Sequence, residues 1–538
     1  MRHRPLVSAA ALASVVLVLT ACSPSTGSSS AAAAITIGTT DKVTALDPAG
    51  SWDNGSATLQ NQVFAWLLTS KPGETNPSPD LAESAEFTSS TEYTVKLRPG
   101  LTFQNGHALT ASDVKFSFDR QVAIADANGP SSLLSDLDSV RVDGDDTVVF
   151  KLKSADYTLW PQVLTSPASA IVDEEVFSAN AITSDENIVA GKAFDGQYGI
   201  SSYTFNSLVE LTKNSKYDGL LGAAKTDTVL VKYYTDESNL KLDVQRNDVQ
   251  VAYRTLSATN IDNLRDSDAV KIYTGPGAEM RFFAFNFETM PYGSKTDTPD
   301  EAKALAVRTA AADLIDRATI AEQVYQGTYT PLYTVVPSGL PESTPSYESL
   351  YGDGKGGPSL DAAKKALKDA GVKVPVELNL QYNSDHYGAS ASDEYALVKS
   401  QLEDSGLFTV NLQSTAWTLY VKQFATTYPA YQLGWFADFP DSDNYLNLLY
   451  GTDESPSVLG TAIKNSDFNA LVQKERTLDN GDERTAAIQQ AQDVTARQIA
   501  IVPLLEGTQT VIAATSVTGI ESTLDGSGRF RFGLLGSE

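Results

Sequence analysis

The chain has 538 residues, with 67 acidic and 40 basic side chains, a formal charge of −27 and a single cysteine. So much acid disfavours nucleic-acid binding, because contacts to phosphates need basic patches. One cysteine excludes a disulfide framework, and the length exceeds one ordinary core of about 100 to 200 residues, so we expect two or three lobes. A cationic ligand and a solvated acidic surface are both consistent with this charge.

The N-terminus has the order of an export signal. Two arginines precede an apolar run from Leu6 to Leu19, and this run is shorter than the about 20 residues of a membrane-spanning helix. It ends at Leu19-Thr20-Ala21-Cys22, which resembles a bacterial lipobox. The resemblance implies that residues 1–21 are removed and that Cys22 carries acyl chains that hold the protein at the cell membrane. An ordinary signal with an incidental thiol is the alternative.

A tether and the first folded elements follow. Residues 22–34 consist of the cysteine followed by Ser, Pro, Thr, Gly and Ala, a composition typical of a flexible linker. The fold is predicted to start with a strand at Ile35–Gly38, followed by a helix at Ala57–Leu68 with apolar residues at helical spacing. Alternating patterns predict half-buried strands at Tyr93–Leu97 and Thr147–Leu152.

The middle of the chain continues the alternation of strands and helices. Strands are predicted at Asp227–Tyr234 and Met280–Phe287, and a long helical pattern covers Glu301–Gln326. A second helix is predicted at Ser359–Ala370, because Ser359 is a suitable N-cap and Gly371 stands where a left-handed residue commonly ends a helix.

Two more predicted strands, Val374–Tyr382 and Tyr431–Trp435, follow with helices between them. The interleaving of helices and strands predicts α/β lobes. We find no internal repeat of 20 to 50 residues.

A set of motifs resembles one protein family over nearly all of residues 35 to 520. The most specific is Tyr93 to Phe103 with the turn and helix start that follow it, up to Phe118. The other motifs occur in the expected order: Leu46-Asp47-Pro48, Pro79 to Ser84, Phe285-Asn286, Val307-Arg308, Ile315 to Arg317, and Trp435 to Asp441. The chain resembles the bacterial extracellular solute-binding proteins of family 5, which include dipeptide- and oligopeptide-binding receptors of ABC importers.

The resemblance implies an α/β, two-lobed, periplasmic-binding-protein-like fold of class II with an additional domain and a hinged cleft. The expected division is a signal at 1–21, a tether at 22–34, lobe I at 35–63, 192–300 and 505–538, an extra domain at 64–191, and lobe II at 301–504.

The resemblance also implies a function. It predicts an extracytoplasmic lipoprotein, without enzymatic activity or cofactor, that closes around a short peptide and delivers it to the permease subunits of an ABC transporter. We expect a monomer that binds no nucleic acid. A receptor for another solute of the same family, such as an oligosaccharide or a metal chelate, is the alternative.

The strongest candidate for ligand binding is the segment Tyr431–Asp441. An apolar strand passes through Gly434, Trp435 and Phe436 and places Asp438 just beyond its end. In peptide receptors of this family, the aspartate of this motif pairs with the α-amino group of the ligand, so the resemblance assigns this role to Asp438. A simple polar turn of Asp438, Asp441 and Asp443 is the alternative, and a calcium loop lacks the required Gly and Glu.

Other ligand contacts are implied by position. Trp52 and Asn54 follow a segment that contacts ligand in the family, and Trp417 precedes the strand of Asp438; burial in the core is the alternative for each tryptophan. Some relatives bind the peptide carboxylate with an arginine where this chain has Gln432. Arg281 or Arg254 could serve instead.

Two other functions are disfavoured. Gly352 to Gly357 fits the pattern G-x-G-x-x-G, but no convincing strand precedes it. A flexible connection is therefore a better interpretation than a nucleotide site. A secreted hydrolase lacks its chemistry, because only His107 and His386 remain after signal removal and no serine-hydrolase or zinc-protease motif occurs. We expect His107 to be a surface loop residue.

Overall fold

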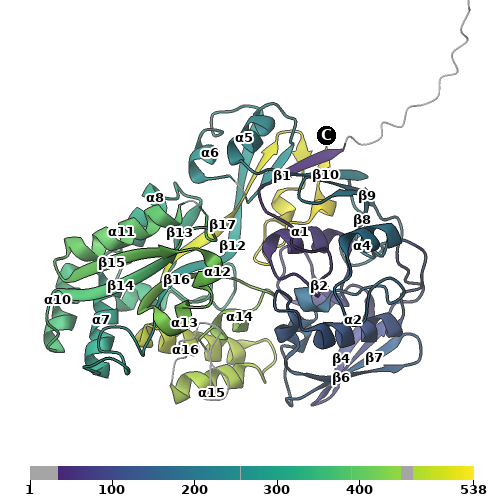
Figure 1. The fold of residues 1–538 in the computed structure, drawn as a ribbon. Helices are drawn as coiled ribbons and strands as arrows, with labels where there is room; N and C mark the ends of the chain where they lie inside the picture. The colour runs from purple at the N-terminus through teal and green to yellow at the C-terminus, as the bar shows by residue number, and fades with distance from the viewer. Residues whose placement is uncertain (1–33, 255, 389, 450–464, 538) are drawn as a thin grey trace, which may run out of the picture.

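A computed structural model describes residues 34–254, 256–388, 390–449 and 465–537. The predicted signal, Cys22 and residues 22–33 lie outside this part of the chain. The described elements gather into two bodies that face each other (Figure 1). No helix in the described ranges is long and apolar enough to cross a membrane.

One sheet runs through both bodies. Its strands follow the order β15-β14-β16-β12-β17-β11-β1-β10-β9-β8, and β13 pairs with β17 beside this path. The longest strands, β12 (Val270–Phe285) and β17 (Ile501–Ala514), are antiparallel partners and pass from one body to the other. Their register shifts between Gly275 and Glu279. The two bodies are therefore joined by a pair of long strands.

The first body combines parallel and antiparallel strand pairs. β1 pairs in parallel with β10 and β11, and their apolar side chains pack against α1 and the segment around Phe194. Its strands are β1 (Ile35–Thr39), β8 (Tyr198–Thr204), β9 (Leu208–Lys213), β10 (Thr228–Tyr233), β11 (Val251–Tyr253), β18 (Val517–Thr518) and β19 (Gly536–Ser537). Its helices are α1 (Asn54–Val63), α4 (Asp185–Gly191), α5 (Glu237–Gln245) and α6 (Ala258–Asp262), with 3-10 turns at Glu521–Thr523 and Phe532–Leu534.

A separate four-stranded antiparallel sheet lies below the first body in Figure 1 and has its own core, which includes Phe118, Phe150 and Trp160. We call residues 64–191 the extra domain. Its strands are β2 (Leu68–Ser70), β3 (Pro77–Pro79), β4 (Ala82–Ser89), β5 (Glu92–Leu97), β6 (Leu137–Asp143) and β7 (Thr147–Leu152). α2 (Ala111–Ile124), α3 (Trp160–Val163) and 3-10 turns at Ser131–Leu134 and Pro167–Ser169 complete it. α4 lies within this range but packs Ile188 into the core of the first body.

The second body contains the largest core. Met280 to Phe285 of β12 pack there with helices α7, α11 and α16. Its strands are β13 (Tyr329–Pro331), β14 (Val376–Asn383), β15 (Phe408–Thr415) and β16 (Ala430–Phe436). Its helices are α7 (Glu301–Leu314), α8 (Arg317–Gln323), α9 (Ser346–Leu350), α10 (Leu360–Asp369), α11 (Ala391–Asp404), α12 (Trp417–Tyr420), α13 (Phe424–Thr427), α14 (Asp443–Leu446), α15 (Ser466–Glu475) and α16 (Asp482–Gln498).

Most predicted elements are confirmed. The six strands at 35–38, 93–97, 147–152, 227–234, 374–382 and 431–435 all occur within a few residues of the predicted bounds. In α10 the Ser359 hydroxyl accepts a hydrogen bond from the Ala362 amide at 3.2 Å, and Gly371 has φ +66°. The cap signals at both ends of that helix therefore act as predicted.

Three predicted bounds are wrong. The helix predicted at 57–68 is α1, which begins after the cap residue Asp53 and ends at Val63. The Phe64 amide makes the last helical bond, to Gln60, and the Ala65 amide donates to the Asp195 carboxylate instead. The pattern at 301–326 is broken between α7 and α8, where Asp316 caps a new helix by accepting from the Thr319 amide. The strand predicted at 280–287 is the end of the longer β12.

The glycine-rich segment forms a loop between α9 and α10. Gly352, Gly354 and Gly356 all have positive φ, and helix α9 rather than a strand precedes them. The phosphate-binding turn of a dinucleotide site follows a strand, so the better interpretation, a connection, is confirmed.

Candidate functional site

The sheet brings the carboxyl ends of parallel strands in each body to one edge. β14 runs parallel to β15 and β16, so the residues that follow them, His386, Trp417 and Asp438, lie at a common edge. β1, β10 and β11 are parallel in the first body, and their ends lead to Asp41 and Arg254. Ligands of open α/β sheets bind outside such strand ends.

Asp438 is held by hydrogen-bond donors from both bodies. Its carboxylate accepts a bond from the Trp52 indole N–H at 2.6 Å and another from the Asn444 side-chain amide at 3.2 Å. Trp52 belongs to the first body and Asn444 to the second. The structure therefore brings together Asp438 and Trp52, which were predicted separately as ligand contacts, across the contact between the bodies.

Desolvation raises the pKa of Asp438 to about 6, although the bonds from Trp52 and Asn444 partly oppose this. No Lys, Arg or His in the described part of the chain forms an ion pair with this carboxylate, which has neutral donors only. A partly buried carboxylate without a counter-charge attracts a cationic group.

Asn444 organises this site, and sequence reasoning missed it. Its side-chain oxygen accepts bonds from the Trp435 indole N–H at 2.8 Å and from the Asp438 amide at 3.1 Å. Because the oxygen accepts two bonds, the amide nitrogen must face the Asp438 carboxylate. The only sequence signal is a polar residue six positions after Asp438, which is too weak to single it out.

Gly434 and Phe436 shape the strand before Asp438. A Cβ atom at Gly434 would lie 2.9 Å from Tyr387 Cε1 and 3.1 Å from the Met280 oxygen, so only glycine allows this packing. The guanidinium of Arg254 lies 4.5 Å from the centre of the Phe436 ring, a cation–π contact between the two bodies. Arg254 has φ +60°, a conformation that costs about 1–2 kcal/mol in a non-glycine residue.

The other predicted contact residues lie near this site but do not join it. Trp417 stacks on His386 with ring centres 3.9 Å apart and planes at 7°, and its amide donates to Asp385. Asn54 is the first residue of α1, two positions after Trp52. Trp52 itself is 41% exposed, so it is not a core tryptophan.

The structure distinguishes the two arginines that could bind a carboxylate. Arg281 is buried and donates to Glu279 at 2.9 Å and to the hydroxyls of Tyr325 and Tyr329 at 2.7 and 2.8 Å. Its guanidinium donors are therefore used within the protein rather than offered to a ligand carboxylate. Arg254 lies at the edge, over Phe436.

Asp441 and Asp443 have structural partners, unlike Asp438. Asp441 forms a two-bond ion pair with Arg484 at 2.7 and 3.0 Å, and Asp443 pairs with Arg476 at 2.7 Å. The polar-turn interpretation therefore fits these two residues. The described residues contain no group of three or more acidic, His or Cys side chains that could hold a metal ion.

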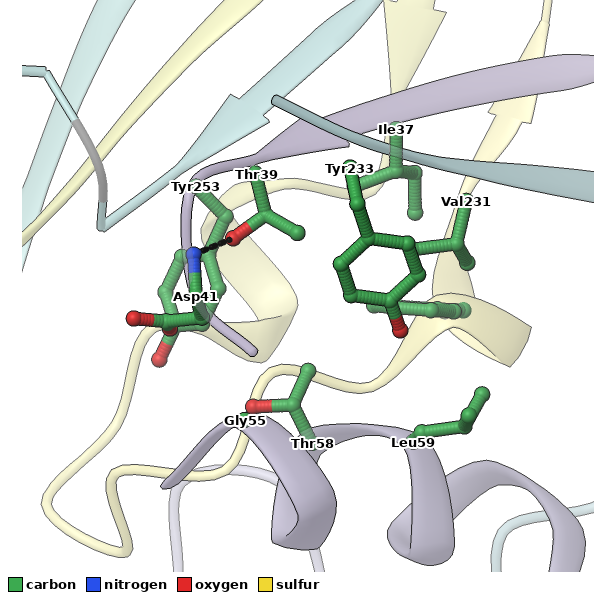
Figure 2. Close-up of a pocket in the computed structure, with 10 residues that line it drawn as sticks. Ile37, Thr39, Asp41, Gly55, Thr58, Leu59, Val231, Tyr233 and Tyr253 are labelled. Atoms are coloured by element: carbon green, nitrogen blue, oxygen red, sulfur yellow. Dashed lines mark hydrogen bonds between the residues drawn. The ribbon is translucent and has the colours of Figure 1, made fainter. Parts of the chain in front are cut away.

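A small pocket lies at the strand ends of the first body (Figure 2). It is lined by Ile37, Thr39, Asp41, Gly55, Thr58, Leu59, Val231, Tyr233, Tyr253 and Phe532. The Asp41 amide donates to the Thr39 hydroxyl at 3.1 Å, and burial raises the pKa of the Asp41 carboxyl. The mostly apolar lining would suit a ligand's apolar group better than a second charge.

His107 is a loop residue with a definite partner. Its Nδ1 atom lies 2.8 Å from the Asp173 carboxylate, and hydrogen bonding to Asp173 raises its pKa. The prediction of a loop position is confirmed; the side chain is half-buried.

Comparison with known proteins identifies relatives of the whole described fold. Residues 76–457 match the family model of bacterial extracellular solute-binding proteins, family 5. The chain is 24% identical to Di/tripeptide-binding protein 3 of Pseudomonas aeruginosa over 85% of each chain, and 24% identical to Heme-binding protein A of Haemophilus influenzae over 82% and 81%. The structure of AppA from Bacillus subtilis in complex with a nonapeptide matches with a TM-score of 0.73 and 21% identity, over 94% of this chain and 99% of that one.

Proposed function

We infer that this chain, which belongs to the bacterial extracellular solute-binding proteins of family 5, captures short peptides in a closing cleft and passes them to the permease of an ABC importer. The observation that carries this proposal is Asp438, a carboxylate at a strand end that receives neutral donors from both bodies. A peptide's α-ammonium group would supply the missing counter-charge. Relatives named for dipeptides, tripeptides and oligopeptides support the choice of ligand.

The proposed mechanism is closure of two lobes. We propose lobe I, the extra domain and lobe II as predicted, except that the lobe boundaries lie within β12 and β17 rather than at residues 300 and 505. Packing supports this change, because Met280 to Phe285 belong to the core of the second body. A ligand that touches both lobes favours the closed state by its difference in affinity for the two states.

The remaining assignments are proposals from the sequence. A receptor of this kind needs a permease partner and a position outside the cytoplasm. A lipid on Cys22 would hold it there at the membrane surface. We propose Asp438, Gly434, Trp435, Phe436, Trp52, Asn54 and Trp417 as ligand contacts, with Arg254 facing the ligand carboxylate. The family consists of solute-binding proteins rather than enzymes.

A receptor for a chelate or a sugar is the second candidate. Trp417 stacks between His386 and Tyr420, so its ring faces are covered. The exposed indole of Trp52 beside Asp438 favours this candidate, since it offers a flat apolar face to a ring-shaped ligand. One relative is named a heme-binding protein.

A thermal unfolding experiment separates these candidates. A peptide with a free amino terminus at 100 times its Kd should stabilise the protein by about 2.7 kcal/mol and raise the Tm by on the order of 3 °C. Heme and oligosaccharides at the same concentration should leave the Tm unchanged. A rise with heme or with a sugar, and none with a peptide pool, would contradict the peptide assignment.

The affinity for a peptide should depend on pH below about 6. The raised pKa of Asp438 means that the free protein holds a proton there below pH 6, and ammonium binding must release it. The affinity should therefore be constant above pH 7 and about tenfold weaker at pH 5, as calorimetry can measure. Asp438→Asn is the control, because this variant keeps the other titratable groups near the cleft, such as Asp41 and His386. If the affinity of the variant depends on pH as strongly as that of the parent, the assignment to Asp438 is contradicted.

A further inference from the structure

The two bodies also touch at the turn between α15 and α16. The Thr158 amide and hydroxyl both donate to the Arg476 carbonyl at 2.9 Å, and the hydroxyl also lies 2.9 Å from the Leu478 carbonyl. The Asn480 side chain donates to the Asn76 side-chain oxygen at 3.0 Å. Thr158 and Asn76 belong to the extra domain, and residues 476–480 form the turn between α15 and α16 of the second body. We call these contacts the clasp.

The same turn is tied to the segment that carries Asp438. Arg476 donates through its side chain to Asp443 at 2.7 Å. Arg484 binds Asp441 through two bonds, Glu475 at 2.8 Å and the Asn480 oxygen at 2.9 Å. The acidic members, Asp441, Asp443 and Glu475, are 6%, 3% and 0% exposed, and Arg484 is 3% exposed. Buried, mutually bonded charges of this kind form a rigid unit.

Phe439 provides a second connection to the extra domain. It follows Asp438 directly, is 5% exposed, and belongs to the same core cluster as Leu81 and Phe118 of the extra domain. We call the segment Asp438–Asp443 the ligand loop. It contacts lobe I through Trp52 and the extra domain through Phe439. Arg476 and Arg484 connect it to the turn that forms the clasp. In Figure 1, α14 and α15 face the extra domain.

We propose that the extra domain, through the clasp, positions the ligand loop and holds the two lobes closed. Thr158 and Asn76 are positioning residues in this view, because they touch no ligand and act through the turn 476–480 and its ion pairs. Contacts between bodies form only in the closed state, so they favour that state and slow ligand release. The effect on ligand affinity rests on the proposed function, whereas the effect on closure does not.

The test replaces Thr158 by Val, which keeps the side-chain shape and the backbone bond to Arg476 but removes the hydroxyl. Loss of one hydrogen bond in the closed state should raise the Kd for a free-amine peptide about three- to tenfold, mainly through a faster dissociation rate. The Kd ratio between an N-acetylated and a free peptide should stay as in the parent, because Asp438 is untouched. Asn76→Ala is the second variant and should have an effect in the same direction.

Thr88→Val is the matched control. Thr88 also lies in the extra domain, but among the described residues its hydroxyl bonds only within its own sheet, to Thr94 and Glu92. Small-angle scattering of the ligand-free proteins should show a larger radius of gyration for Thr158→Val than for Thr88→Val. Equal radii and equal dissociation rates in these two variants would overturn the clasp. If the parent binds no peptide, the proposed function fails while the scattering comparison still decides the clasp.

Discussion

Replacing Asp438 by Asn should weaken the binding of a peptide with a free amino terminus by at least tenfold, and by up to about a hundredfold. A hydrogen bond to a charged group contributes about 1.5–3 kcal/mol, and each 1.4 kcal/mol changes the affinity tenfold. The amide has nearly the same shape as the carboxylate and keeps an oxygen that can accept from the Trp52 indole. The charge is lost, and an NH2 group replaces the oxygen that accepts from the Asn444 side chain. Titration calorimetry measures the change.

The control for this variant is a second carboxylate, five residues further along the chain. Asp443 is already paired with Arg476, so Asp443→Asn should affect stability far more than the preference for a free amine. The assignment of Asp438 to the α-ammonium group of the ligand is contradicted if Asp438→Asn binds the free peptide as tightly as the parent does.

Replacing Arg484 by Met should lower the free energy of unfolding by about 3–5 kcal/mol. The change would leave Asp441 and Glu475 buried without their cation, and breaking a buried pair by removing one partner has costs of this size. Arg484 contacts both carboxylates at 2.7 and 2.8 Å, and their burial is nearly complete. Denaturant unfolding followed by circular dichroism measures the change.

Lys365→Met is the matched control for the buried pair. Lys365 pairs with Asp369 one helical turn away, and the two side chains are 76% and 59% exposed. An exposed pair of this kind contributes about 0.3–0.5 kcal/mol. If Arg484→Met unfolds within 1 kcal/mol of this control, the ion pairs do not hold the ligand loop as described.

Local signals predicted the elements whose ends are set by their own residues. The helix after Ser359 is the clearest example, since its cap hydroxyl and its closing glycine are both in the predicted places. The single helix predicted at 301–326 was wrong because the apolar periodicity continues across the break between α7 and α8. The local signal for that break was present, since Asp316 is a good cap residue and starts the new helix. The end of α1 depends on Asp195, 130 residues away, which no local pattern contains.

The candidate site was only partly predictable. The motif around Trp435 pointed to Asp438, but the partner of Asp438, Trp52, lies 386 residues away in sequence. Arg281 and Arg254 were equivalent in sequence, and only burial showed that Arg281 is bound to Glu279 and two tyrosines. Asp441 and Asp443 could be separated from Asp438 only when their arginine partners were located.

The affinities of one short peptide and its N-acetylated analogue for the unmodified protein, measured side by side by calorimetry at pH 7, test the role of the Asp438 carboxylate most directly. We predict that the free peptide binds at least ten times more tightly, because only it carries a positive group for the carboxylate to hold. Equal affinities would contradict the idea that this side chain selects a cationic chain end.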